Sequence, residues 1–230
     1  MNLRRLLPGI AVLACLLIAA CAPPPELRDE TLLDETGLIT GDPCEAPCFR
    51  GITPGETVWR DALTIIEDDA SFENIQSQED ENTDAIGAIW NVRGGPECCQ
   101  MVAEDGETVN LLFIRTRPNM TLEEVIDVHG DPSYAVGTPV TDDQAIVNLV
   151  YPDVPMIVLA FSAGPETGEV SQDSEIIGML YTTPDDMNLF MQTNSLHAWE
   201  GYDSFNTYRS ADDAEYEITP SITVTPTPAS

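Results

Sequence analysis

The chain has 230 residues, with nine Arg, no Lys and 40 acidic residues, which gives a formal net charge of −31. This charge repels nucleic acid and anionic lipid, so we expect no nucleic acid among the partners. General acidity from genome composition or a saline habitat would explain the same charge. After a signal, a tether and a tail are set aside, roughly 160 residues remain, enough for one domain or two small repeats.

The first 21 residues are typical of an exported protein. Arg4 and Arg5 precede the apolar run LLPGIAVLACLLIAA, which is shorter than the ~20 residues that cross a bilayer. The block Ile18-Ala19-Ala20-Cys21 resembles a bacterial lipobox, in which the cysteine is diacylated after the residues before it are removed. We therefore predict a signal peptide at 1–20 and a lipid anchor at Cys21, on the extracytoplasmic face of the cell membrane. An ordinary cleavable signal and an uncleaved anchor are the alternatives.

Composition divides the rest of the chain. We expect a Pro-rich, acidic tether at 21–42, an α+β domain at 43–205 and a disordered Thr/Pro-rich tail at 206–230. Within the domain, the acidic segment 73–84 predicts a solvated loop.

Four cysteines remain in the mature domain, namely Cys44, Cys48, Cys98 and Cys99. In an exported protein this number predicts two disulfides. A bond between the adjacent Cys98 and Cys99 would close a strained ring, so we expect the first two cysteines to pair crosswise with the last two. A zinc site is the alternative, although the spacing fits tetrahedral ligation poorly.

The elements of the first half follow from caps and turns. A helix is predicted to begin at Thr57, a good N-cap, after the Pro54-Gly55 turn. Asp105-Gly106 is a strong hairpin signal. Strands are predicted at 86–93, 98–104 and 107–115.

The second half has clearer helix signals. Thr121-Leu122-Glu123-Glu124 matches a capping box, and Gly130 followed by Asp131-Pro132 ends that helix. Thr183, with Pro184 and two acids after it, predicts a third helix through about Thr193. Strands are predicted at 133–139, 145–151, 156–163 and 174–182.

Two segments of the chain are weakly alike. Residues 51–66 and 115–130 both contain Pro, two further residues, a Thr cap and an amphipathic helix, and strands follow each helix. We therefore predict two α-β-β-β repeats, at about 43–116 and 117–205. They would form an antiparallel sheet with helices packed on one face, an α+β fold.

The segment from Cys44 to Gly55, CEAPCFRGITPG, resembles a family of uncharacterised lipoproteins of Chloroflexota-type bacteria, which has a Pro-Cys-(aromatic)-x-Gly-Ile-x-Pro-Gly signature. More distantly, this segment and TLEEVIDVHGDPS, residues 121–133, look like parts of BamE/SmpA-like lipoproteins and β-lactamase-inhibitor-like repeats. That likeness implies helices on an antiparallel sheet and function through protein–protein contact. Asn119 departs from the pattern, since the first copy has Gly55 there.

The sequence offers no catalytic constellation that we recognise. His129 and His197 are expected to be structural, with His129 at a helix C-terminus. Acidic pairs such as Asp142-Asp143 lack the alternating spacing of a calcium loop, so we predict no metal site and no cofactor. The other acidic clusters are Glu67-Asp68-Asp69, Asp185-Asp186 and Asp212-Asp213.

The sequence thus predicts a lipid-anchored binding or scaffolding protein of the bacterial cell envelope, with an unidentified protein partner and no catalysis. Any site is expected where the Pro54-Gly55 and Gly130-Asp131-Pro132 turns and the Trp199–Tyr202 segment expose aromatic surface. A solute- or cation-binding lipoprotein is the first alternative, and an envelope hydrolase is the second.

Overall fold

The structure, a computed structural model, describes residues 26–34 and 37–211. The strands are β1 (Phe72–Glu79), β2 (Ile86–Val92), β3 (Glu97–Ala103), β4 (Leu111–Thr121), β5 (Tyr134–Pro139), β6 (Ala145–Tyr151), β7 (Met156–Ser162), β8 (Glu169–Val170), β9 (Glu175–Thr182), β10 (His197–Ala198) and β11 (Asp203–Ser204). The helices are α2 (Gly37–Thr40), α3 (Trp59–Asp68), α4 (Leu122–His129), α5 (Pro184–Thr193) and α6 (Phe205–Tyr208).

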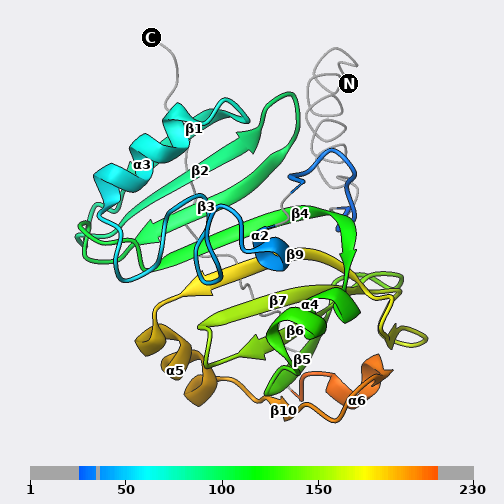
Figure 1. The fold of residues 1–230 in the computed structure, drawn as a ribbon. Helices are drawn as coiled ribbons and strands as arrows, with labels where there is room; N and C mark the ends of the chain where they lie inside the picture. The colour runs from blue at the N-terminus through cyan, green and yellow to red at the C-terminus, as the bar shows by residue number, and fades with distance from the viewer. Residues whose placement is uncertain (1–25, 35–36, 212–230) are drawn as a thin grey trace, which may run out of the picture.

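One nine-stranded sheet organises the molecule, in the order β1-β2-β3-β4-β9-β7-β6-β5-β10 (Figure 1). Every neighbouring pair in this sheet is antiparallel. The antiparallel sheet and the α+β class are therefore confirmed. Strands β1 to β4 follow α3, and β5, β6, β7 and β9 follow α4, so that β4 and β9 meet at the centre.

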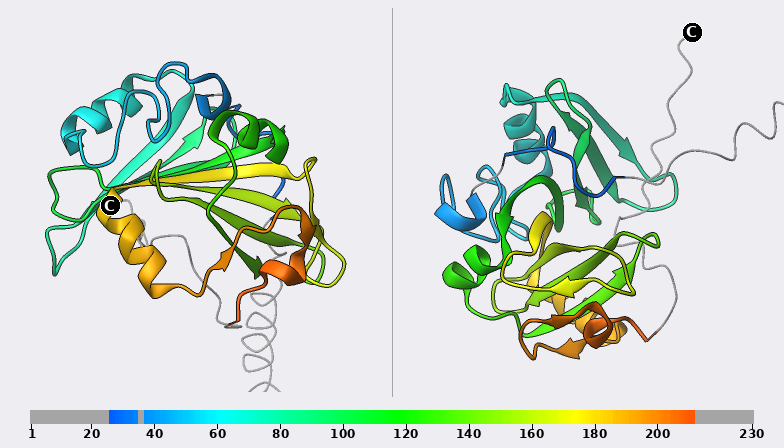
Figure 2. Two further views of the ribbon diagram at one scale, coloured as in Figure 1. Left: turned by 60° about the horizontal axis from the view of Figure 1, so that its bottom comes forward. Right: turned by 90° about the vertical axis from the view of Figure 1, so that its right-hand side faces the viewer.

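The two faces of the sheet are covered by different helices. Leu38 of α2, Trp59 of α3, Leu122 of α4 and Phe205 of α6 belong to the larger apolar cluster. Met187 of α5 belongs instead to a second cluster, on the opposite side of the strands. Figure 2 (left) shows α3 and α4 on one side of the sheet and α5 on the other. The described helices therefore pack on both faces, whereas the sequence predicted one; we call the α5 side the second face.

Two of the three predicted helix starts are found. Helix α4 begins with the complete capping box between Thr121 and Glu124, and α5 begins at Thr183 with Pro184 in the first turn. Helix α3, by contrast, has Val58 as its N-cap, with no side-chain cap. The Thr57 hydroxyl is used one turn earlier, where it accepts a hydrogen bond from the Thr53 N–H at 2.9 Å.

The predicted loop at 73–84 is wrong over most of its length, because β1 occupies Phe72–Glu79. This strand forms an edge of the sheet, and after Phe72 each of its side chains is either half-buried or exposed. An edge strand that is solvated on both faces does not need alternating apolar residues, so its sequence carries no strand signal. Strand β1 is a strand because its backbone pairs with β2.

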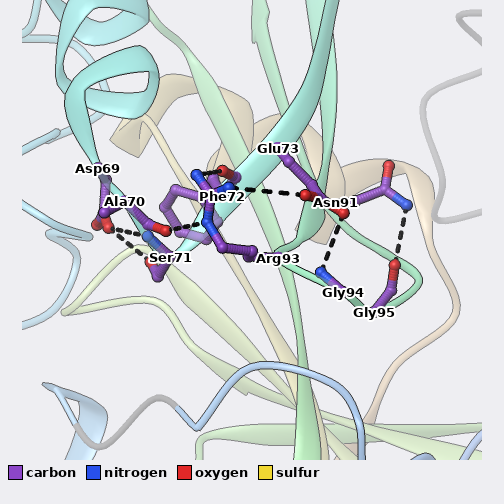
Figure 3. A network of polar contacts seen from close by, with 9 residues as sticks. All are labelled: Asp69, Ala70, Ser71, Phe72, Glu73, Asn91, Arg93, Gly94 and Gly95. Carbon is purple, nitrogen blue, oxygen red and sulfur yellow. Dashed lines mark hydrogen bonds and ion pairs between the residues drawn. The ribbon is translucent and has the colours of Figure 1, made fainter.

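A polar network fixes this edge strand (Figure 3). Arg93 donates from Nη2 to the Phe72 carbonyl oxygen at 2.9 Å, and its backbone N–H donates to the Ser71 carbonyl oxygen at 2.8 Å. The Gly94 N–H donates to Glu73 Oε1 at 3.0 Å. The connection between α3 and β1 is thereby held against the β2–β3 turn.

Chain segments at both ends differ from the expectation. Residues 26–34 and 37–42 do not form an extended tether, because Leu32, Leu33 and Leu38 are buried in the main cluster. At the other end, Tyr208 is buried and Ser210 bonds to the backbone of β5, so the packed part continues to the end of the described chain. The predicted signal peptide, Cys21 and the tail from residue 212 lie outside the described residues.

Candidate functional site

A cavity of about 290 Å³ opens on the second face of the sheet, across β3, β4, β6, β7 and β9. Its apolar wall consists of Leu27, Phe113, Ile146, Leu159 and Ile177. The remaining lining residues are Glu97, Cys98, Cys99, Gln100 and Arg115. This volume is at the small end of the range for sites that bind small molecules.

Strand β4 supplies the centre of the cavity through simple alternation. Leu112, Ile114 and Thr116 are fully buried in the core, while Phe113 and Arg115 point to the second face and are half-buried. Because side chains alternate along a strand, the apolar run of β4 serves both faces. The charged guanidinium of Arg115 therefore lies on the same face of β4 as the apolar side chain of Phe113.

The second face divides into two halves. A row of directly paired residues crosses it and comprises Gln76, Ile89, Gln100, Phe113, Leu180, Ile157 and Val150. The last three are buried, between 0% and 6% exposed, near α5. By contrast, Gln76 is exposed and Ile89 and Gln100 are half-buried. The half formed by β1 to β3 is thus the accessible one, and the cavity lies at its border.

Residues 26–34, at the N-terminal end of the described chain, are called the strap here; the strap begins on this face with Leu27, and its Leu32 and Leu33 reach the main cluster on the other side of the sheet. The Leu27 N–H donates to Gln144 Oε1 at 3.0 Å, and Arg28 pairs with Glu175 at 3.0 Å. The Arg28 guanidinium also lies 4.9 Å from the centre of the Phe161 ring. Leu27 thereby becomes part of the cavity wall.

Arg115 is the basic group of the cavity. Its Nη2 donates to the carbonyl oxygen of Glu26 in the strap at 3.1 Å. Burial lowers the pKa of the Arg115 guanidinium, and the negative charges of Asp29 and Glu97 offset part of that effect. The group keeps its charge at neutral pH, since an arginine in a protein does not lose its proton.

Both disulfides are local, which corrects the predicted crosswise pairing. Cys44 bonds to Cys48, and Cys98 bonds to Cys99. A turn, in which the Cys48 N–H donates to the Glu45 carbonyl oxygen, brings the first pair within 5.7 Å between Cα atoms, a usual disulfide spacing.

The adjacent pair lies at a β-bulge in β3. The register shifts between Trp90 and Asn91 of β2, which face Cys99 and Glu97, so Cys98 is an extra residue on β3. Both cysteines are 1% exposed, although neighbours on a regular strand point to opposite faces. The bulge thus accounts for two consecutive buried side chains, and the disulfide forms part of the cavity wall.

The turns and aromatic residues singled out in the sequence do not form one site. Gly130-Asp131-Pro132 lies beside the Trp199–Tyr202 segment, since the Trp199 N–H donates to the Ser133 carbonyl oxygen. Tyr202 is 47% exposed there and packs edge-on against Trp199. Pro54-Gly55 lies elsewhere, beside Thr183 at the start of α5.

The two histidines both contact backbone carbonyl groups. His129 Nε2 lies 2.7 Å from the Leu38 carbonyl oxygen, and His197 Nε2 lies 2.9 Å from that of Arg209. The His129 ring also packs edge-on against Tyr151. Burial, followed by the charge of Asp131, raises the pKa of the Tyr151 hydroxyl, which has no hydrogen-bond partner among the described residues.

Several carboxylates of the acidic clusters accept hydrogen bonds from nearby side chains or backbone groups. The Asp186 carboxylate accepts hydrogen bonds from the Thr183 hydroxyl and the Asn110 amide, and Asp143 accepts one from the Thr141 hydroxyl. Asp105 accepts hydrogen bonds from two backbone N–H groups of its own turn, which lower its pKa. No group of three or more potential metal-ligating residues is found in 26–34 and 37–211. Asp212-Asp213 lies outside this range.

The chain matches no protein-family model, no curated protein and no solved structure. Within the part of the chain that the structure describes, none of the helices has the length and apolar character needed to cross a membrane.

Proposed function

We propose that the protein is a lipid-anchored binding or scaffolding protein on the extracytoplasmic face of the bacterial cell membrane, without a catalytic role. The binding function is supported by the cavity at the border of the accessible half of the second face. The anchor rests on the lipobox that ends at Cys21. The two local disulfides support an oxidising compartment, where such bonds persist.

We further propose that the domain arose from two repeats, each a helix followed by four strands of the large sheet instead of the three that the sequence predicted. The support is the order of the sheet, in which β1 to β4 on one side mirror β5, β6, β7 and β9 on the other. Helices α3 and α4 occupy matching places before the two sets of strands, and both contribute to the main cluster. The proposed kinship with the lipoprotein family that has the Pro-Cys-(aromatic)-x-Gly-Ile-x-Pro-Gly signature rests on the segment from Cys44 to Gly55 alone.

A protein partner would bind most readily on the accessible half of the second face. Gln76 and Ile89 offer mixed polar and apolar surface there, next to the cavity. A solute-binding lipoprotein is the second candidate, and the cavity itself favours it over a cation-binding one, because its wall is mostly apolar.

Metabolic labelling tests the anchor. Cells that express the full chain are given radioactive palmitate, and the labelled protein is followed through membrane fractionation. We expect label and membrane association in the natural chain and in a Cys15→Ser control, and the loss of both in Cys21→Ser. Equal labelling of Cys21→Ser would reject the anchor.

Site-specific crosslinking tests the binding face. A photoreactive amino acid replaces Gln76 on the second face or Thr64, an exposed residue of α3 on the opposite side. In intact cells we expect a discrete crosslinked species from position 76 and none from position 64. Identical patterns from the two positions would exclude the second face as a specific protein-binding surface.

A further inference from the structure

Arg115 differs from the other arginines of the described chain in its electrostatic partners. Five of them form ion pairs with carboxylates: Arg28, Arg50, Arg93, Arg117 and Arg209. Arg60 is exposed to water on α3. Arg115 is half-buried, and no carboxylate of the described residues forms an ion pair with it, although the chain has 40 acidic residues. A half-buried cation without a paired anion is costly to desolvate.

The hydrogen-bonding capacity of Arg115 is also largely unused. A guanidinium carries five N–H donors, and the hydrogen bond to the Glu26 carbonyl oxygen is the one found among the described residues. The other donors belong to a side chain that lines the cavity, next to Phe113, Leu159 and Ile177. The cavity therefore combines the hydrogen-bond donors of one guanidinium group with an apolar wall.

We propose that this cavity binds a small monocarboxylic acid, whose carboxylate pairs with Arg115 and whose apolar body contacts Phe113, Leu159 and Ile177. The inference rests on the binding function proposed above and names the class of ligand. Arg matches a carboxylate through two parallel hydrogen bonds.

The surrounding charges favour a singly charged ligand. Asp29 and Glu97 act on Arg115 through their charges, and Glu97 lines the cavity. They would repel a dianion such as a phosphate monoester more strongly than a monocarboxylate. An ammonium compound would face Arg115 itself. The cavity volume of about 290 Å³ limits the apolar body to a small group such as one aromatic ring.

A fluorine NMR titration tests the proposal on the full chain in detergent micelles. The probe is 4-fluorobenzoate, and 4-fluorobenzyl alcohol and 4-fluorobenzylammonium are its neutral and cationic counterparts. Protein-free micelles give the blank for each compound. We expect saturable binding of the benzoate and at least about tenfold weaker binding of the two counterparts, a ratio equivalent to ~1.4 kcal/mol.

Two matched variants assign the charge recognition to one residue. Arg115→Gln removes the charge but keeps a donor for the strap, and Arg60→Gln makes the same change at an exposed site. We expect benzoate affinity to fall at least about tenfold in Arg115→Gln and to stay within about twofold in Arg60→Gln. Should Arg115→Gln not fold, as judged by circular dichroism, Leu159→Phe fills the cavity wall and should abolish benzoate binding.

The proposal would be overturned by equal affinity for the three compounds, or by unchanged benzoate affinity in a folded Arg115→Gln variant or in Leu159→Phe. The absence of saturable binding of the benzoate up to about 5 mM would overturn it as well. A specific crosslink from position 76 together with any of these results would leave the proposed binding function standing and remove only the carboxylate ligand.

Discussion

The capping box of α4 allows a prediction about which of its two side chains matters more. Glu124 Oε2 accepts a hydrogen bond from the Thr121 N–H at 2.8 Å, whereas the Thr121 hydroxyl accepts one from the Glu124 N–H at 3.4 Å. The second bond is at the long limit for a hydrogen bond. We therefore expect the carboxylate to stabilise the helix start more than the hydroxyl does.

The expected magnitudes follow from these distances. Thr121→Ala should lower the free energy of unfolding by about 0.5–1 kcal/mol, the lower part of the range for N-caps. Glu124→Ala removes a charge-assisted hydrogen bond and a favourable charge in the first turn, so we expect a loss of about 1–2 kcal/mol. Both side chains are solvent-accessible, and water can hydrate the freed N–H groups, which keeps the losses small.

Urea unfolding monitored by circular dichroism measures these differences. Thr64→Ala is the control, because Thr64 is exposed within α3 and its hydroxyl donates to the Arg60 carbonyl oxygen. That substitution should be neutral or slightly stabilising. A larger loss for Thr121→Ala than for Glu124→Ala would refute the argument from hydrogen-bond length.

Three further predictions concern the core, the disulfides and acid stability. Ile114→Ala, at a fully buried central position, should cost about 2–5 kcal/mol in urea unfolding, against less than about 0.5 kcal/mol for the exposed Val128→Ala. Proteolysis of the unreduced protein, followed by mass spectrometry, should find each disulfide within one peptide, and a peptide linking the two cysteine regions would contradict the local pairing. Burial alone would raise the pKa of Asp69, but hydrogen bonds from Ser71 and the charge of Arg50 outweigh it and lower the pKa. A lowered folded pKa stabilises above the unfolded value of about 4 and loses this effect as the pH falls, so Asp69→Asn should be destabilising at pH 7 and approach the natural protein below pH 4 in thermal unfolding.

The predictable parts of the fold are those with local signals. Helices α4 and α5 begin where Thr121 and Thr183 cap them, because the cap and the groups it bonds lie within three residues. The apolar strands of the sheet centre also follow from short runs of sequence. Strand β1 could not be predicted in this way, because its formation depends on backbone pairing with β2 rather than on its own side chains.

The candidate site was less accessible to sequence reasoning. Arg115 lies in a strand predicted at 107–115. That no carboxylate of the described residues forms an ion pair with it depends on which residues the fold brings together, and the sequence does not show this. A signal did exist, since Leu111, Phe113 and Arg115 form one alternating stripe in which a charge follows two apolar residues. The strap was predicted to be part of a tether, because three prolines precede it and its own acidic residues surround Leu32 and Leu33, which are buried.

The attachment of the strap at Glu26 limits the distance between the domain and its proposed anchor. Five peptide steps separate Cys21 from Glu26, whose carbonyl oxygen bonds to Arg115 beside the cavity. A fully extended chain of that length spans at most about 18 Å. With Cys21 acylated, the cavity would therefore open at the membrane surface itself, and its ligands would be exchanged within the thin layer of solvent next to the lipid head groups.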